Sequence, residues 1–170
     1  ESLTKGEIEG RKAALEAIAA LKEYMPGCSA GKLRNFGMTI GIRDTYKIDS
    51  VYNISDEDVK NECRFEDSLG IYPEFIDGFG VLVLPTTGRY MHIPYRSLLP
   101  KNIKGLLVVG RAIGGSNIAH AATRNMACCT VTGQGAGVAA AETIKNKTSL
   151  NSVNISNVQK LLSNQNVRVF

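Results

Sequence analysis

Hydrophobic residues near the start of the chain recur at a helical spacing. The residues on this apolar face are Ile8, Leu15, Ile18 and Leu21. Thr4 and Glu7, three residues apart, form a capping-box pattern at the start of this stretch. Pro26 and Gly27 form a pair that typically ends a helix. The pattern therefore predicts a helix that begins near Thr4 and ends before Pro26.

Three later segments have a hydrophobic pattern typical of β-strands. Residues 36–54 are rich in β-branched and aromatic side chains, which predicts a strand or a hairpin. Residues 80–100 predict a hairpin with a turn from Thr86 to Gly88 and a second strand that Pro94 breaks. Residues 106–109 are apolar without alternation, which predicts a strand that is buried on both faces.

The remaining segments predict helices. Ser55 followed by three acidic residues is a helix-cap pattern and predicts a short helix. Residues 127–146 predict a helix dense in small side chains, although each of its three glycines costs about 1 kcal/mol relative to alanine. Such glycines indicate that the backbone approaches a sheet, another helix or a cofactor closely. After an Asn- and Ser-rich linker at residues 146–156, residues 155–170 predict a short amphipathic helix and an extended end.

Composition and charge are those of an ordinary soluble globular protein. The 170 residues are 44% hydrophobic and 21% charged, with a net charge of +4. Basic residues form no run, so nucleic-acid binding is not indicated. No apolar stretch approaches the roughly 20 residues of a membrane span. These features predict one soluble domain with its own hydrophobic core.

The cysteines favour a reducing compartment. Cys28, Cys63, Cys128 and Cys129 have spacings that suit neither a zinc site nor a disulfide framework. We therefore expect no metal site and a cytoplasmic location. The vicinal pair Cys128 and Cys129 is interpreted as two small buried residues, because a ring between neighbouring cysteines is strained.

The glycines after residue 109 fit neither familiar nucleotide-binding motif. A P-loop needs Lys and Ser or Thr after its last glycine, and none follows here. The first group, residues 110–115, departs from the G-x-G-x-x-G spacing, and the second, Gly133 to Gly137, lies inside the predicted helix. The chain therefore lacks the pyrophosphate loop of a self-contained dinucleotide domain, which argues against an NAD-dependent Rossmann enzyme.

The order of strand, Gly-Arg, glycine-rich loop and small-residue helix resembles the C-terminal half of FAD-dependent oxidoreductases whose flavin domain follows the glutathione-reductase plan. The segments that carry the resemblance are collinear: GIRDTYKI, ISDEDV, HIPYRSLLP, LLVVGRAI, HAATRNMACCTVTGQGAGVAAA and NVQKLLSNQNVRVF. The resemblance implies an α/β fold: the C-terminal part of a glutathione-reductase-like, Rossmann-type FAD-binding fold with part of a substrate domain. One departure is that the family usually has Pro and Thr before a Cys where this chain has Ala127, Cys128 and Cys129.

The resemblance also implies a cofactor and a partner. The cofactor is FAD, and the half of the site that carries G-x-G-x-x-G is absent here, so we expect it on a second chain that arises from its own gene or by cleavage of a precursor. The Gly-Arg turn would lie beside the ribityl and pyrophosphate groups, and the helix start under the pyrimidine edge of the flavin ring. The implied cofactor-binding residues are Gly110, Arg111, Ala112, Met126, Ala127, Cys128, Cys129 and Gly133.

Two polar residues between these segments are the candidate catalytic groups. The resemblance puts His120 and Arg124 near the substrate side of the flavin, where His120 could accept a proton and Arg124 could bind a carboxylate or a flavin carbonyl. The alternative is a hydrogen-bonded structural pair. Arg96 is interpreted as a structural residue, and Asp44 as half of a surface ion pair with Arg43.

The expected domain organisation has three parts. Residues 1–100 form a substrate- or cap-side segment of helix and hairpins, residues 101–145 complete the FAD-binding domain, and residues 146–170 form a linker and a C-terminal helix. The chain is then one subunit or processed chain of an enzyme that transfers a hydride between flavin and a small, anionic organic substrate. The basic groups near the site could equally serve the pyrophosphate of FAD. The alternative function is a non-catalytic scaffold or regulatory subunit of a flavoprotein complex.

Overall fold

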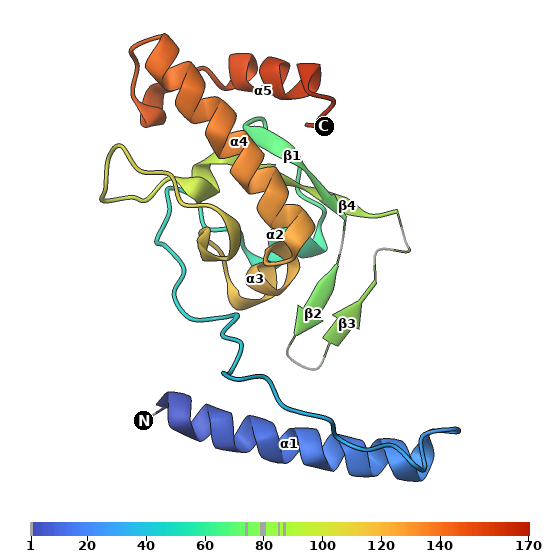
Figure 1. Ribbon diagram of the computed structural model, residues 1–170. Helices are drawn as coiled ribbons and strands as arrows, with labels where there is room; N and C mark the ends of the chain where they lie inside the picture. Colours follow the sequence, from blue (N-terminus) through green and yellow to red (C-terminus); the bar gives the residue numbers. More distant parts are fainter. Residues whose placement is uncertain (1, 74, 79–80, 85, 87) are drawn as a thin grey trace. The chain divides into compact units, whose positions relative to one another are not determined.

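The computed structural model describes residues 2–73, 75–78, 81–84, 86 and 88–170. The chain divides into two compact units, Glu1–Arg43 and Asp44–Phe170, and Figure 1 shows both in sequence colours. The second unit is a mixed α/β structure with small sheets. The three-part organisation expected from the sequence, with boundaries at residues 100 and 145, stays a prediction.

The first unit consists of α1 (Ser2–Tyr24) and an irregular segment that follows it. The predicted end of the helix before Pro26 is confirmed, and Gly27 takes a left-handed φ of 84° that suits glycine after a helix. The predicted cap is wrong, because no Pro or Gly stops the helix ahead of Thr4 and it extends back to Ser2. Among the residues described in α1 none is buried, so its predicted apolar face is not covered.

The predicted strand or hairpin across residues 36–54 is wrong. The only bridges there are isolated ones, from Ser50 to Pro100 and from Ile54 to Gly115, within the part of the chain that the structure describes. β-branched and aromatic residues favour a strand only where a neighbouring strand supplies a ladder of hydrogen bonds. This segment has no such neighbour over its length.

The second unit holds two short antiparallel sheets. In one, β1 (Ser68–Pro73) pairs with β4 (Tyr90–Pro94); in the other, β2 (Ile76–Gly78) pairs with β3 (Val81–Val83). The predicted hairpin of residues 80–100 is therefore wrong, because its two strands belong to different sheets. Part of its predicted turn, Thr87, lies outside the described residues.

The predicted later helices are confirmed. Ser55 caps α2 (Asp56–Lys60) in a complete capping box with Asp58. The small-residue helix is α4 (Met126–Lys145), and the amphipathic one is α5 (Ile155–Asn164). Three short 3₁₀ helices and one α-helix lie between or beside these elements: η1 (Tyr95–Leu98), η2 (Gly110–Ala112), α3 (Asn117–Thr123) and η3 (Leu150–Ser152).

The predicted buried strand at residues 106–109 is wrong. The segment is not part of a sheet among the described residues, and Leu106 and Val109 are 42% and 40% exposed. The segment is joined to η1 by a backbone hydrogen bond of 2.9 Å from Val108 N–H to the Leu98 carbonyl. An apolar run indicates burial, but only a neighbouring strand turns it into a sheet strand.

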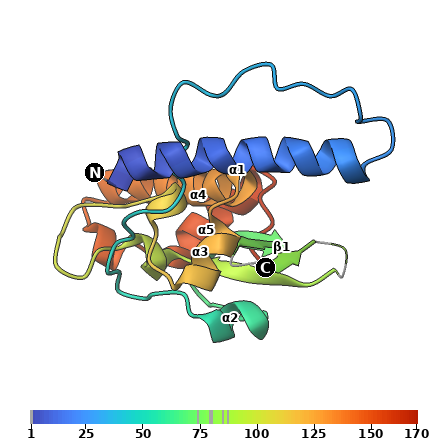
Figure 2. The same cartoon turned by 90° about the horizontal axis from the view of Figure 1, so that it is seen from below.

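The core of the second unit lies where α4 crosses β1, with α5 packed against both (Figure 1). Viewed from below, the same helices lie over the sheet, and α3 packs against α2 (Figure 2). Its largest fully buried side chains include Ile54, Leu69, Ile93, Leu98, Val158 and Leu162. A Cβ on Gly135 would lie 2.8 Å from Leu69 Cδ1, so this glycine lets α4 approach β1 closely.

Candidate functional site

The Gly110 turn is held against the first turns of α4. Gly110 has a left-handed φ of 70°, and its N–H donates to Thr132 Oγ1 at 3.0 Å. The Thr132 hydroxyl is fully buried and donates in turn to the Cys129 carbonyl at 2.9 Å. A Cβ on Gly110 would lie 3.7 Å from Cys129 Sγ. Two of the predicted cofactor-binding segments therefore meet, joined by Thr132, which sequence reasoning did not single out.

The N-terminus of α4 has no side-chain cap. Asn125 stands at the N-cap position, but its side chain donates to the Ala122 carbonyl at 3.1 Å instead of accepting from the helix. The N–H groups at the start of a helix have no partner inside it, and they add to the positive end of its dipole. Met126 is 89% exposed, Ala127 is exposed, and Cys128 is fully buried. The backbone of this turn can therefore receive an anionic or carbonyl group.

One face of α4 is uncovered. Gly133 and Gly137 are exposed, and an added Cβ on either would meet no atom within 4 Å. Residues at the same helical spacing are exposed as well, and we call this set the open face of α4: Met126, Thr130, Gly133, Gly137, Ala141 and Ile144. Two of the three glycines of the helix are therefore not explained by packing among the described residues.

His120 and Arg124 lie one turn apart at the end of α3. His120 is 3% exposed, and its Nδ1 lies 3.6 Å from Asp44 Oδ2. Arg124 hydrogen-bonds the Asp77 carbonyl, and its side chain, 9% exposed, lies 3.8 Å from Asp77 Oδ2. Asp44 Oδ1 in turn accepts from Lys47 Nζ at 3.0 Å. Each member of the predicted catalytic pair thus lies beside one carboxylate, His120 beside Asp44 and Arg124 beside Asp77.

Charge and burial keep His120 neutral near neutral pH. Burial lowers the pKa of His120; Asp44 opposes this, and the cations Lys47, Arg124 and Arg111 add to the lowering. For Asp44, the hydrogen bond from Lys47 is the main cause of a lowered pKa, so its carboxyl is ionised. A neutral imidazole beside an ionised carboxylate is an arrangement suited to accepting a proton.

The glycine turn and the polar pair belong to one region. Burial raises the pKa of the Cys129 thiol, and the positive charge of Arg111 lowers it in part, so Arg111 acts on both Cys129 and His120. The Cys129 thiol also contacts the Arg124 carbonyl at 3.5 Å. The start of α4 and the end of α3 are therefore in contact, and Arg111, whose charge acts on both Cys129 and His120, is exposed.

Other polar residues of the second unit have structural partners. Arg96 Nε donates to Asp67 Oδ2 at 2.9 Å and its guanidinium covers the Tyr52 ring, which agrees with the structural interpretation. His92 Nδ1 accepts from Phe65 N–H at 3.1 Å. Asp44 was expected at the surface beside Arg43; it also faces His120, which spacing along the chain did not indicate.

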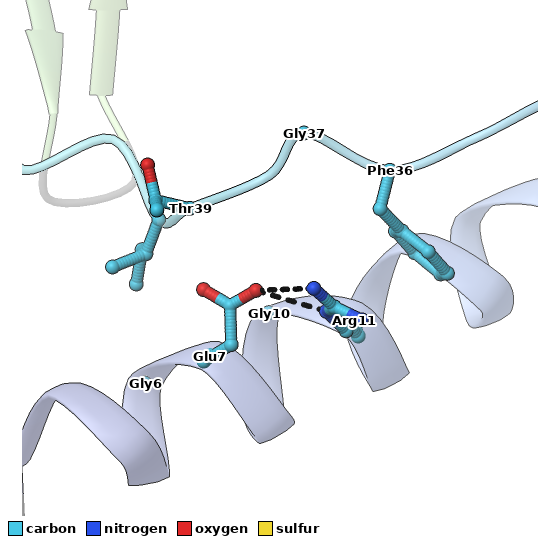
Figure 3. Close-up of a pocket in the computed structure, with 8 residues that line it drawn as sticks. Gly6, Glu7, Gly10, Arg11, Phe36, Gly37 and Thr39 are labelled. Carbon is cyan, nitrogen blue, oxygen red and sulfur yellow. Dashed lines mark hydrogen bonds and ion pairs between the residues drawn. The ribbon is translucent and has the colours of Figure 1, made fainter.

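A pocket of about 150 Å³ lies in the first unit, between α1 and the segment after it (Figure 3). Glu7 pairs with Arg11 at 2.7 Å, and the Arg11 guanidinium lies 5.3 Å from the centre of the Phe36 ring. None of the predicted site residues lines this pocket. The ion pair lies within α1, and we interpret the contact between Arg11 and Phe36 as a tie that holds the segment on the helix.

Among the residues that the structure describes, no helix is both long enough and apolar enough to cross a membrane. No cluster of three or more His, Cys, Asp or Glu side chains in this part of the chain is arranged to hold a metal ion.

Comparison with known proteins gives one match. A family model described as FAD dependent oxidoreductase matches residues 1–162. No curated protein and no solved structure matches the chain.

Proposed function

The chain belongs to the FAD-dependent oxidoreductase family, and we propose that it forms one part of an enzyme that transfers a hydride between a small organic substrate and FAD. FAD supplies the hydride chemistry when bound, and the protein supplies position and electrostatics. The observation that carries this proposal is the Gly110 turn, which Thr132 ties to the uncapped start of α4.

The residues around that turn fit FAD. A flat ring with polar carbonyls at one edge needs backbone donors and little side-chain bulk. The uncapped first turn at Met126, Ala127 and Cys128 supplies N–H groups, and Gly133 one to two turns later leaves space above the helix. Cys129 lies against the glycine turn, and Gly110, Arg111 and Ala112 would hold the ribityl and pyrophosphate groups of FAD. Arg111 is exposed and cationic, which suits a phosphate.

His120 and Arg124 are the proposed catalytic residues. The lowered pKa of His120, caused first by burial, leaves it neutral and able to accept a proton from the substrate. Arg124 binds an anionic substrate group or a flavin carbonyl, and Asp77 holds its guanidinium in place. A carboxylate-bearing hydride donor is the substrate class that these charges favour.

We further propose that a second chain completes the FAD site and carries its G-x-G-x-x-G half, in a glutathione-reductase-like, Rossmann-type arrangement. Two uncovered apolar surfaces support this partner. One is the open face of α4, where Met126 is 89% and Ile144 79% exposed; the other is the extended segment 106–109. Uncovered apolar surface of this kind marks a site of protein association.

The first test of the proposal is the flavin content of the chain alone and of its native complex. We expect the purified 170-residue chain to show little flavin absorbance, and the complex isolated through it to be yellow and to contain a second chain with G-x-G-x-x-G. A single chain that is monodisperse and loaded with FAD contradicts the proposal that a second chain completes the FAD site. A native complex that holds no flavin under any loading condition contradicts the proposal that the complex is a flavin-dependent enzyme.

The second test separates an enzyme from a scaffold subunit. In the native complex, His120→Gln is expected to lower turnover of small carboxylate hydride donors by about 100-fold, the lower range for loss of a general base, while FAD stays bound. Arg96→Gln, outside the proposed site, serves as the control. Unchanged turnover in the His120 variant removes it from the catalytic residues, and a native complex without turnover favours the scaffold.

A further inference from the structure

The Nδ1 atom of His120 is buried without a hydrogen-bond partner. The ring is 3% exposed, so water does not replace the missing partner freely. The acidic group facing this atom is the Asp44 carboxylate, with Oδ2 at 3.6 Å. Contacts of catalytic groups are often long in a protein without its ligands and shorten when the ligands bind.

Asp44 is held in place over α3. Lys47 Nζ contacts Asp44 Oδ1 at 3.0 Å and Asn117 Oδ1, on α3, at 3.4 Å. The backbone of the same segment is tied to η2 by a 3.0 Å hydrogen bond from Ile48 N–H to the Ala112 carbonyl. One carboxylate oxygen is thus occupied by Lys47, and the other faces the imidazole.

The charges around the ring decide which of its nitrogens carries the proton. The cations that act on His120 come from three parts of the chain: Lys47 before α2, Arg124 at the end of α3 and Arg111 in η2. They oppose a protonated ring, as burial does, and the acid among these neighbours is Asp44. Asp56 of α2 is engaged by Ser116, and Asp77 of β2 by Arg124. A neutral imidazole has one N–H, and a facing carboxylate attracts that N–H while it repels a lone pair.

We propose that Asp44 is a positioning residue that holds the proton of His120 on Nδ1, so that Nε2 carries the lone pair that accepts a proton from the substrate. This inference rests on the proposed function only for the role of Nε2. The placement of the proton is a property of this chain with or without its cofactor.

The direct test is nitrogen NMR of the imidazole rings in the flavin-free chain. The chain has two histidines, so the ring signals that remain in the His92→Gln variant belong to His120, and those that disappear belong to His92. We expect the His120 proton on Nδ1 at pH values where the ring is neutral. A wild-type His120 with its proton on Nε2 overturns the proposal without any variant of Asp44.

Variants of Asp44 test the cause. Asp44→Asn is expected to move the proton toward Nε2, because the amide can donate to Nδ1, and to lower the pKa of His120 further, because the opposing charge is lost. Asp44→Glu is expected to restore the Nδ1 proton. Asp49→Asn is the control, since Asp49 lies on the same segment but pairs with Lys101 at 2.8 Å. A wild-type tautomer in the Asp44→Asn chain overturns the proposal.

Turnover in the native complex adds a second readout. Asp44→Asn is expected to lower kcat by about 10-fold or more, a part of the 10²–10⁴ that a positioned base contributes, and to move the acid limb of the pH profile to lower pH. Wild-type turnover of His120→Gln contradicts the proposed function but leaves the tautomer result standing. A kcat and pH profile in Asp44→Asn equal to those of the wild type contradict the positioning role.

Discussion

At the scale of single residues, Thr132 joins the two segments that the flavin proposal depends on. It is fully buried on α4 and accepts the hydrogen bond of Gly110 N–H while it donates to the Cys129 carbonyl. A donor left without a partner away from water costs more than the same bond contributes when it is made. The conformation of the Gly110 turn is therefore sensitive to this one hydroxyl.

Thr132→Val is expected to lower the free energy of unfolding by about 1–3 kcal/mol, because valine keeps the shape and leaves Gly110 N–H unsatisfied. Thr130→Val is the control, since the Thr130 hydroxyl is exposed and bonds only within its own helix, to the Met126 carbonyl at 3.0 Å. Urea unfolding of both variants measures the difference. Equal stability of the two variants contradicts a structural role for the Thr132 hydroxyl.

At the scale of elements, the glycines of α4 serve different purposes. Gly135 faces Leu69 of β1 so closely that a Cβ has no room, whereas Gly133 and Gly137 face open space. Helix propensity disfavours all three equally. Packing among the residues that the structure describes explains only Gly135, and the proposed cofactor and partner chain explain the other two.

Gly133→Ala and Gly137→Ala are each expected to raise the free energy of unfolding of the chain by about 1 kcal/mol, because alanine favours the helix and nothing obstructs its methyl group. Gly135→Ala is expected to lower it by about 1–3 kcal/mol through overpacking against Leu69. Urea unfolding of the three variants tests both directions. Destabilisation by Gly133→Ala contradicts an open face on this helix.

One of these two stabilising substitutions also tests what covers that face. In the native complex, Gly133→Ala is expected to weaken FAD retention, because the added methyl group stands where the proposal places the ring. Ala141→Gly on the same face, about four turns from the helix start, changes bulk away from the ring and serves as the control. FAD release during dilution, followed by flavin fluorescence, measures retention. Wild-type retention in Gly133→Ala contradicts the assignment of Gly133.

At the scale of the whole molecule, both histidines are buried, His92 at 4% and His120 at 3% exposure. Burial is the main cause that lowers the pKa of each below 6.5. The unfolded chain therefore binds more protons than the folded one as the pH falls past that value. Stability is fully present above about pH 6.5 and is lost as the pH falls through the pKa values of the folded state.

The free energy of unfolding is thus expected to fall between about pH 7 and pH 5, a window in which only the histidines among these shifted groups titrate. Asp44 and Asp58, whose pKa values are lowered from the usual 3.8, change the free energy of unfolding only at lower pH than this window. His92→Gln is expected to reduce this loss, because one of the two buried rings is removed. Urea midpoints at pH 7.5, 6.5 and 5.5 measure the slope; an equal slope in wild type and variant contradicts the assignment to His92.

The sequence by itself determined three helices of the second unit, α2, α4 and α5, whereas α3 was not predicted. The capping box at Ser55, the small-residue helix α4 and the amphipathic α5 follow from interactions within a few residues, which a single chain segment contains. The collinear segments also indicated the flavoprotein family that the family model supports over residues 1–162. Local physics and motif order were sufficient for these features.

Only the tertiary structure decided strand pairing and the surroundings of the site. Residues 36–54 and 106–109 have strand-like composition, but a ladder needs a neighbour that composition cannot supply. The strands expected to pair with each other, β3 and β4, lie in different sheets, where β3 pairs with β2 and β4 pairs with β1. Asp44 reaches His120, and Thr132 reaches Gly110, only because the chain folds back on itself and brings distant residues within hydrogen-bonding or ion-pair range.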